Sequence, residues 1–390
     1  MTCQHAPIPG LEPALKRSFV CRCGRPVFFR NSRCLNCGSE LGFDPVAGEV
    51  VVVDPQQDGT WRAATGDNPG RAYRRCANLD TAAACNWLLP QAPELMPKGP
   101  DGQPLVARRL CVACAVNRTI PDLSDPARAA QWGRIELAKR RLVSALLAMG
   151  LPFRSRLDED PAHGVVFDFL ADVPGQPRVL TGHADGVITL NVAEADDAVR
   201  EKARAAMHEP YRTLLGHLRH EIGHYYWDLL VAGTPWLAPF RGLFGDERAD
   251  YAQALQRHYD QGAPADWEQH FISAYASMHP WEDWAETWAH YLHIDDTIAT
   301  ANAYGLQLAD TELEYRPFTA PALYDPDAPD AAHFLECIND WVRLTGVLNE
   351  LSRSMGVNDF YPFVMPAAVV AKLQFVHEVV QAQKTRSPTV

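Results

Sequence analysis

The chain has 390 residues and a formal net charge of −12, and 47% of its residues are hydrophobic. This length is sufficient to bury a large core and predicts two or three domains. The acidic balance argues against a general nucleic-acid-binding protein. Because no apolar run approaches the roughly 20 residues that a membrane-spanning helix needs, we expect no contact with a membrane.

Eight of the ten cysteines fall into two quartets with the spacing of metal sites. The first quartet resembles the two knuckles of a zinc ribbon, with Gly24 and Gly38 in the tight turns that follow each pair. Its members are Cys21, Cys23, Cys34 and Cys37. Only one residue separates the first pair, where two are usual, so Cys3 is an alternative ligand. We expect a structural zinc ion in a ribbon over residues 1–60.

The second quartet ends in a Cys-x-x-Cys pair and predicts another closed zinc site, over residues 61–120. It consists of Cys76, Cys85, Cys111 and Cys114. Cys337 is left as an ordinary buried thiol. No secretory segment precedes the first quartet, so we expect thiolates in a reducing compartment, the cytoplasm, rather than disulfides.

Arginines crowd the first ribbon, at Arg22, Arg25, Arg30 and Arg33. Such a run of charge usually forms a solvated face. In a chain with a net charge of −12, this run does not indicate a nucleic-acid site. The ribbon therefore remains a candidate binding site for a protein partner.

The segment Pro121-Asp-Leu-Ser-Asp-Pro126 predicts a hinge into a larger domain over residues 121–390. Ser124 or Asp125 can cap a helix from about Pro126 to Met149. Alternating polar and apolar residues predict a strand over residues 182–194, which is either an edge strand for β-addition of an extended substrate or a structural hairpin strand. The remainder is predicted to be mainly helical, including residues 331–351 and 366–383.

The segment His220-Glu221-Ile222-Gly223-His224 has the HExxH pattern. At i and i+4 of a helix, His220 and His224 lie on one face, about 5–6 Å apart at Cβ, and can bind one Zn²⁺. Glu221 can then take a proton from the metal-bound water and hand it to a leaving amine. Leucines and Ile222 at helical spacing place the motif on a long, largely buried helix that begins near Pro210. The pattern predicts metal-assisted hydrolysis of a peptide bond.

The sequence offers two candidates for the third metal ligand. There is no HExxHxxGxxH continuation, which argues against a three-histidine site. Glu247 lies in a segment that resembles the carboxylate-supplying helices of several two-histidine, one-glutamate peptidases. Glu282 lies on an aromatic helix with Glu286, His290 and His293 in one polar stripe. A metal would remove the cost of burying such a carboxylate, although an ion-paired bundle helix also accounts for the stripe.

Strings along nearly the whole chain resemble the zinc-binding metallopeptidases that carry an N-terminal zinc-ribbon domain. They are CNWL, AKRRL, HEIGHYYW, LFGDERADY and FISAYASMHPWEDWAETWAHYLH. The core is also similar to the gluzincins related to anthrax lethal factor and the Mlc titration factor peptidases. In those enzymes a tyrosine precedes the ligand glutamate by the interval that separates Tyr275 from Glu282.

That resemblance implies Glu282 as the third ligand and Tyr275 as the stabiliser of the oxyanion, with a core tyrosine as the alternative for Tyr275. It further implies that Glu286 contacts a ligand and that Glu247 orients a ligating histidine. Glu247 stays the alternative third ligand.

We therefore expect an α+β protein, in which a mainly helical zincin-like metallopeptidase domain with a small sheet follows a cysteine zinc-ribbon region. Its cofactors would be one catalytic and one or two structural zinc ions, and its partner a peptide or protein substrate. The alternative is a zinc-stabilised scaffold or regulatory binding protein that has a peptidase fold and little or no turnover.

Overall fold

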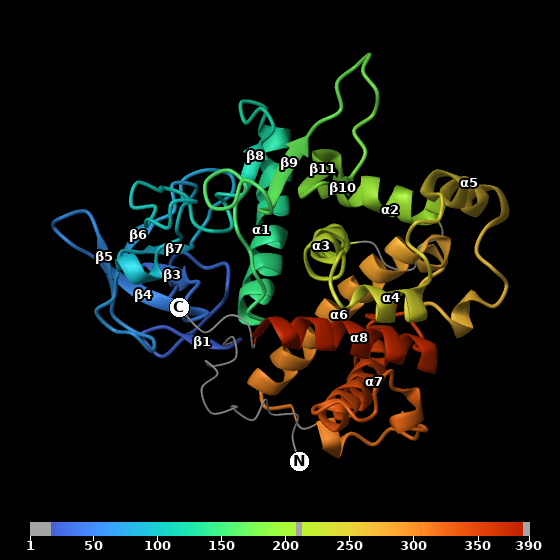
Figure 1. Ribbon diagram of the computed structural model, residues 1–390. Coiled ribbons are helices and arrows are strands. Elements are labelled where there is room, and N and C mark those ends of the chain that lie inside the picture. Colours follow the sequence, from blue (N-terminus) through green and yellow to red (C-terminus); the bar gives the residue numbers. More distant parts are fainter. Residues whose placement is uncertain (1–16, 208–212, 307, 385–390) are drawn as a thin grey trace. The chain divides into compact units, whose positions relative to one another are not determined.

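The computed structural model describes residues 17–207, 213–306 and 308–384. Cys3 and Pro210 lie outside the described residues. The fold is mixed α+β, as expected, and it divides into two compact units. The amino-terminal unit runs to residue 202 and the helical unit starts at residue 203 (Figure 1).

The amino-terminal unit begins with β-structure. Strand β1 (Phe19–Val20) pairs with β2 (Pro26–Val27) in the first cysteine knuckle. A five-stranded antiparallel sheet follows in chain order. Its strands are β3 (Leu41–Asp44), β4 (Glu49–Pro55), β5 (Trp61–Ala63), β6 (Ala72–Arg75) and β7 (Leu88–Pro90). One face of this sheet buries the cluster Val51, Val53, Ala63, Tyr73 and Leu88.

This sheet differs from the expected division between residues 60 and 61. Strand β4 pairs with β5 across that point, with Val53 opposite Ala63. The pairing joins the two predicted cysteine modules, because breaking it would expose the buried core of the sheet.

A four-stranded sheet of order β10-β11-β9-β8 completes the amino-terminal unit. Its strands are β8 (Asn117–Thr119), β9 (Val166–Leu170), β10 (Gly182–Ala184) and β11 (Val187–Asn191). The strand predicted over residues 182–194 is thus a hairpin, of which β10 forms the sheet edge, followed by a short 3₁₀ helix, η2 (Val192–Ala195). The small sheet expected in the metallopeptidase domain therefore lies in the same compact unit as the cysteines.

Helix α1 (Pro126–Ala148) begins where the sequence predicts, because the Asp125 side chain accepts hydrogen bonds from the N–H groups of Ala127 and Arg128. The helix packs on β9. The Nζ atom of Lys139 lies 5.5 and 5.1 Å from the ring centroids of Phe167 and Phe169.

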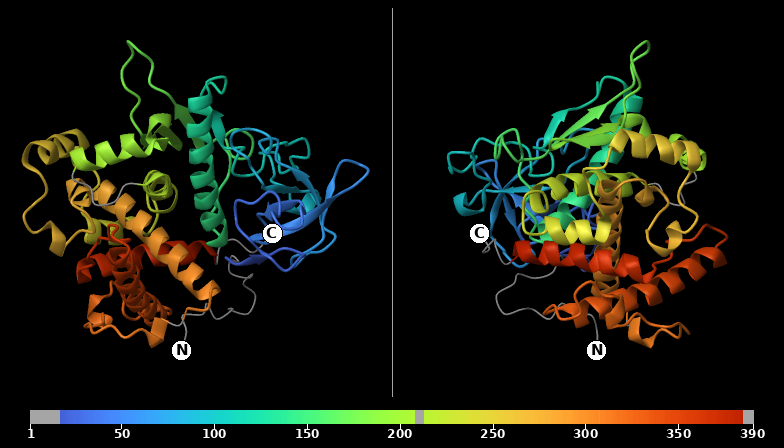
Figure 2. Two further views of the ribbon diagram at one scale, coloured as in Figure 1. Left: turned by 180° about the vertical axis from the view of Figure 1, so that it is seen from behind. Right: turned by 45° about the vertical axis from the view of Figure 1, so that its right-hand side comes forward.

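Seven further helices make up the rest of the described structure, apart from short 3₁₀ turns. They are α2 (Asp197–Met207), α3 (Leu214–Leu230), α4 (Leu237–Phe244), α5 (Tyr251–Gln261), α6 (Pro280–Ala303), α7 (Ala331–Ser354) and α8 (Ala367–Lys384). Helix α6 packs against α3, α7 and α8 (Figure 2). The helices predicted over residues 331–351 and 366–383 are confirmed as α7 and α8. No helix among the described residues combines the length and apolar character needed to cross a membrane.

Helices α3 and α6 lie close together at Gly223. A Cβ atom there would lie 3.1–3.2 Å from Trp288 and from the Cα atom of Ala285. The indole N–H of Trp284 donates to the Gly223 carbonyl at 2.9 Å. The glycine inside the HExxH pattern therefore lets the helix that carries both histidines lie against α6.

Replacing Gly223 by valine tests this contact. The added side chain would push α3 from α6, so Gly223→Val is expected to lower the free energy of unfolding by about 1–3 kcal/mol, as overpacking usually does. Gly242 in α4 is the matched control, because open space surrounds it. Gly242→Ala should raise stability by roughly 0.5–1 kcal/mol through helix propensity. Urea unfolding of both variants measures the difference, and an equally stable Gly223→Val protein would contradict the packing described.

Candidate metal centres

Potential metal ligands converge at three places within the described residues, and all three groups match the sequence-based expectation. In each group the donor atoms lie within 4.8 Å of one another. The groups are His220, His224 and Glu282; Cys21, Cys23, Cys34 and Cys37; and Cys76, Cys85, Cys111 and Cys114.

The mixed group lies between α3 and α6. The two Nε2 atoms of His220 and His224 are 3.2 Å apart. The carboxylate of Glu282 lies 3.0 Å from His220 Nε2 and 3.6 Å from His224 Nε2. Ligands bonded at 2.0–2.1 Å to a tetrahedral zinc ion are about 3.3 Å apart, so this donor set has the spacing that zinc requires.

The charge around the mixed group also calls for a cation. Glu221 and Glu282 are only 9% and 2% exposed, and Glu286 is close by. Within the described chain, none of these three carboxylates forms an ion pair with a lysine or arginine. A divalent ion would offset the cost of burying so much negative charge.

Glu286 fixes the orientation of the His220 ring. The Nδ1–H group of His220 donates to Glu286 Oε1 at 2.7 Å, and the Ser273 hydroxyl donates to Glu286 Oε2 at 2.7 Å. Burial raises the pKa of Glu286, but the hydrogen bond from His220 outweighs it and lowers this pKa to about 2. With its proton on Nδ1, and with a metal in place of a second proton on Nε2, His220 would direct the Nε2 lone pair at the shared point.

Glu282 lies in the first turn of α6, where the helix dipole favours a carboxylate. The Tyr251 hydroxyl donates to Glu282 Oε1 at 2.8 Å. Burial would raise the pKa of Glu282, but the His224 charge and the His220 hydrogen bond hold it well below its usual range. Glu282 is therefore an anion in position to bind a metal.

Glu221 and Tyr275 border the same group. Burial raises the pKa of Glu221, and the nearby His220 and His224 charges oppose that rise. Tyr275 lies in the 3₁₀ turn η4 (Tyr275–Met278). Its ring centroid is 6.1 Å from the ring centroid of His220. Burial and the charge of Glu282 raise the pKa of Tyr275 well above its ordinary value, so its phenol keeps its proton.

The structure does not bring Glu247 into this group. Both of its oxygens accept hydrogen bonds from Arg241, at 2.9 and 2.5 Å. Arg241 lies in the last turn of α4, and Glu247 follows directly after that helix ends at Gly245. The ion pair with Arg241 balances the charge of Glu247, so Glu247 does not orient a ligating histidine.

The polar stripe of α6 divides between the metal group and the protein core. His290 Nδ1 lies 2.6 Å from the Tyr361 hydroxyl oxygen, and His293 Nδ1 lies 2.6 Å from Arg219 Nη1.

Two residues that contact the metal group, Tyr251 and Ser273, were not predicted from the sequence. Tyr251 ends the string LFGDERADY, and Ser273 stands two residues before Tyr275, but no spacing rule connects either residue to the HExxH helix.

The first cysteine quartet brings both members of the short Cys-x-Cys pair together with the second pair. Cys21 Sγ lies 3.6 Å from Cys37 Sγ, and Cys23 Sγ lies 3.8 Å from Cys34 Sγ. Thiolates bonded at about 2.3 Å to a tetrahedral zinc ion are about 3.8 Å apart. The turns form as predicted, because Gly24 and Gly38 have φ values of 78° and 73°.

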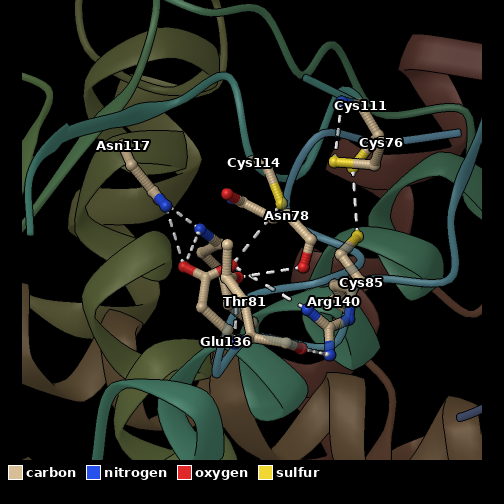
Figure 3. Close-up of polar contacts among 11 residues, drawn as sticks. Cys76, Asn78, Thr81, Cys85, Cys111, Cys114, Asn117, Glu136 and Arg140 are labelled. Atoms are coloured by element: carbon tan, nitrogen blue, oxygen red, sulfur yellow. Dashed lines mark hydrogen bonds and ion pairs between the residues drawn. The ribbon is translucent and has the colours of Figure 1, made fainter. Parts of the chain in front are cut away.

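All four cysteines of the second quartet are buried. Figure 3 shows them together with Glu136 and Arg140. Cys85 Sγ lies 3.6 Å from Cys111 Sγ, and the Cys111 N–H donates to Cys76 Sγ at 3.4 Å. Cys114 Sγ lies 3.7 Å from a Glu136 oxygen of α1. Glu136 in turn pairs with Lys139 at 2.6 Å, so a wholly buried ion pair ties α1 to this site.

The described cysteines form no disulfide. Cys337, expected to be buried, is half-buried, and its Sγ lies 3.7 Å from His333 Nε2. Its place on α7 sets it apart from the three ligand groups.

Comparison with known proteins agrees with these centres. Residues 128–379 match a family described as "Putative zinc-binding metallo-peptidase", and residues 18–125 match a zinc-ribbon domain. An uncharacterized protein of Mycobacterium bovis and one of Mycobacterium tuberculosis are each 43% identical over 366 residues, which cover 93% of this chain and 95% of each relative. No solved structure matches this chain. The chain therefore belongs to the zinc-binding metallopeptidase family and carries an N-terminal zinc-ribbon domain.

Proposed function

We propose that the chain is a zinc-dependent peptidase of the HExxH type, with His220, His224 and Glu282 as the ligands of the catalytic zinc. The observation that carries this proposal is the convergence of donor atoms from His220, His224 and Glu282 next to carboxylates that pair with no lysine or arginine among the described residues. When bound, zinc supplies a Lewis acid that lowers the pKa of water and polarises a peptide carbonyl. The family match supports the same chemistry.

Glu221 is the proposed general base and acid. Its carboxylate takes a proton from the attacking water while the water oxygen bonds to the peptide carbonyl carbon. The proton then passes to the amide nitrogen, the C–N bond breaks, and an amine leaves.

The two tyrosines are assigned different roles. Tyr275, whose phenol is protonated, would donate a hydrogen bond to the carbonyl oxygen as it becomes negative. Tyr251 instead donates to Glu282 and would hold that ligand in place. Glu286 would hold His220 in the same way.

The cysteine quartets are proposed to hold one structural zinc ion each. Neither quartet has an adjacent water-activating carboxylate in the HExxH arrangement, and four thiolates leave no open position. Thiolate sites in place of disulfides favour a reducing compartment, which supports the expected cytoplasmic location.

Loss of the general base separates an enzyme from a zinc-stabilised scaffold. Glu221→Gln keeps the volume of the side chain but cannot accept a proton, so cleavage should fall at least about 100-fold while zinc content stays unchanged. Mass spectrometry of a peptide library incubated with each protein gives both activity and preference. Glu268→Gln, at an exposed site of the helical unit, is the matched control and should cleave normally. Equal cleavage by wild type and Glu221→Gln would remove the mechanism, and no cleavage by wild type would favour the scaffold.

The identity of the third ligand is tested by zinc affinity. Glu282→Ala leaves two imidazoles and should weaken catalytic-site zinc binding more than about 100-fold, beyond the 10–100-fold typical of a group that only orients a ligand. Glu247→Ala should bind zinc as wild type does, because Glu247 pairs with Arg241. Competition with a chromophoric chelator measures both affinities. The opposite order would transfer the ligand role to Glu247.

Phenylalanine substitutions of the two tyrosines should affect different quantities, kcat for Tyr275 and zinc affinity for Tyr251. Tyr275→Phe removes a hydrogen bond made only in the transition state, so kcat should drop while zinc affinity is retained. Tyr251→Phe removes the donor to Glu282 and should weaken zinc binding about 10–100-fold. Tyr259→Phe, at an exposed position of α5, serves as the control. Normal kcat in Tyr275→Phe would show that this tyrosine only packs.

A further inference from the structure

A groove in the amino-terminal unit is lined by the first cysteine ribbon and by one face of α1. Its volume is about 980 Å³. The ribbon contributes residues between Arg25 and Asn36, from both of its knuckles, and α1 contributes Arg134, Leu137, Ala138 and Arg141, which share a helix face at i, i+3, i+4 and i+7. The groove is thus built from two segments that lie far apart in the sequence.

The charge of this groove is opposite to that of the whole chain. The described residues that line it include no aspartate or glutamate but five arginines: Arg25, Arg30, Arg33, Arg134 and Arg141. Arg25, Arg30 and Arg134 are exposed and form no ion pair in the part of the chain that the structure describes. Arg22, by contrast, lies outside the groove and pairs with Asp54 at 2.5 Å. In a chain of net charge −12, such a local excess of cations is typical of a binding surface for an anion.

Apolar side chains lie beside the arginines. Leu35, between Cys34 and Cys37 of the second knuckle, is 98% exposed, and Phe28 is 58% exposed. An exposed apolar patch rimmed by polar groups is a feature of sites of protein association. The guanidinium group also suits carboxylates, because it forms two parallel hydrogen bonds with one carboxylate.

The groove is pre-formed rather than loose. The side-chain amide of Asn86 donates to the carbonyls of Phe29 and Asn31, at 2.8 and 3.0 Å. The Phe29 ring packs edge-on against Phe43, with centroids 4.8 Å apart. The binding of a partner would therefore cost little conformational entropy in the ribbon residues that line the groove.

We propose that this groove binds an acidic peptide segment of another protein, with carboxylates on the arginines and a large apolar side chain against Phe28 and Leu35. Single-stranded nucleic acid fits less well, because such sites stack successive bases on several aromatic rings. Among the described residues that line the groove, Phe28 is the one exposed aromatic side chain, since Phe29 is half-buried. The proposal does not depend on turnover at the zinc site.

Selection from a random dodecapeptide phage library on the full-length chain tests the proposal. The Glu221→Gln background keeps any bound peptide from being cut. Selected peptides should be enriched in Asp and Glu together with Leu, Phe or another large apolar residue. The triple variant Arg25→Glu, Arg30→Glu, Arg134→Glu should lose this enrichment. Selected peptides without excess acid, or the same acidic peptides selected by the triple variant, would overturn the proposal.

Fluorescence anisotropy with the best synthetic peptide then gives affinities. The triple variant should bind it at least about tenfold more weakly, as expected from three reversed charges at exposed sites. A matched triple variant, Arg62→Glu, Arg74→Glu, Arg178→Glu, changes exposed arginines of the same unit outside the groove and should bind as wild type does. Leu35→Ser should weaken binding even in high salt, where the arginine contribution is screened. Equal binding by the two triple variants, no effect of Leu35→Ser, or tighter binding of oligothymidylate than of the peptide would contradict the proposal.

Discussion

Buried negative charge between α3 and α6 is the constraint on which the helical unit depends. Glu221, Glu282 and Glu286 all approach the two histidines, and within the described chain no lysine or arginine offsets them. A divalent cation, bound where the three donor atoms meet, would resolve this conflict. The close helix contact at Gly223 lies inside the same motif, so the packing of α3 on α6 and the arrangement of the two histidines depend on the same few residues.

The amino-terminal unit depends on its two cysteine quartets rather than on a buried carboxylate cluster. Two cysteine quartets hold its loops together beside the buried apolar side chains of its sheets. The second quartet contacts helix α1, because Cys114 lies against Glu136 of that helix. Lys139 pairs with Glu136 and balances its charge. Rigid knuckles of this kind can present exposed side chains such as Leu35 in fixed positions, which is the basis for the proposed peptide groove.

Local spacing predicts a large part of this structure, because i,i+4 histidines and Cys-x-x-Cys pairs place ligands through geometry within one helix or turn. The cap at Asp125 belongs to the same class, and the predicted start of α1 is confirmed. Contacts that depend on tertiary packing could not be predicted in this way. Tyr251 reaches Glu282 from another helix, Arg134 joins the ribbon arginines from α1, and strand pairing carries the five-stranded sheet past the expected boundary at residue 60.

The zinc content of the purified protein tests the central claim most directly. Elemental analysis of protein prepared without added metal should find three zinc ions per chain, one for each ligand group. The double variant His220→Ala, His224→Ala should contain two, because the cysteine quartets do not involve these histidines. The wild type and the double variant having the same zinc content would contradict the assignment of a metal to the HExxH site.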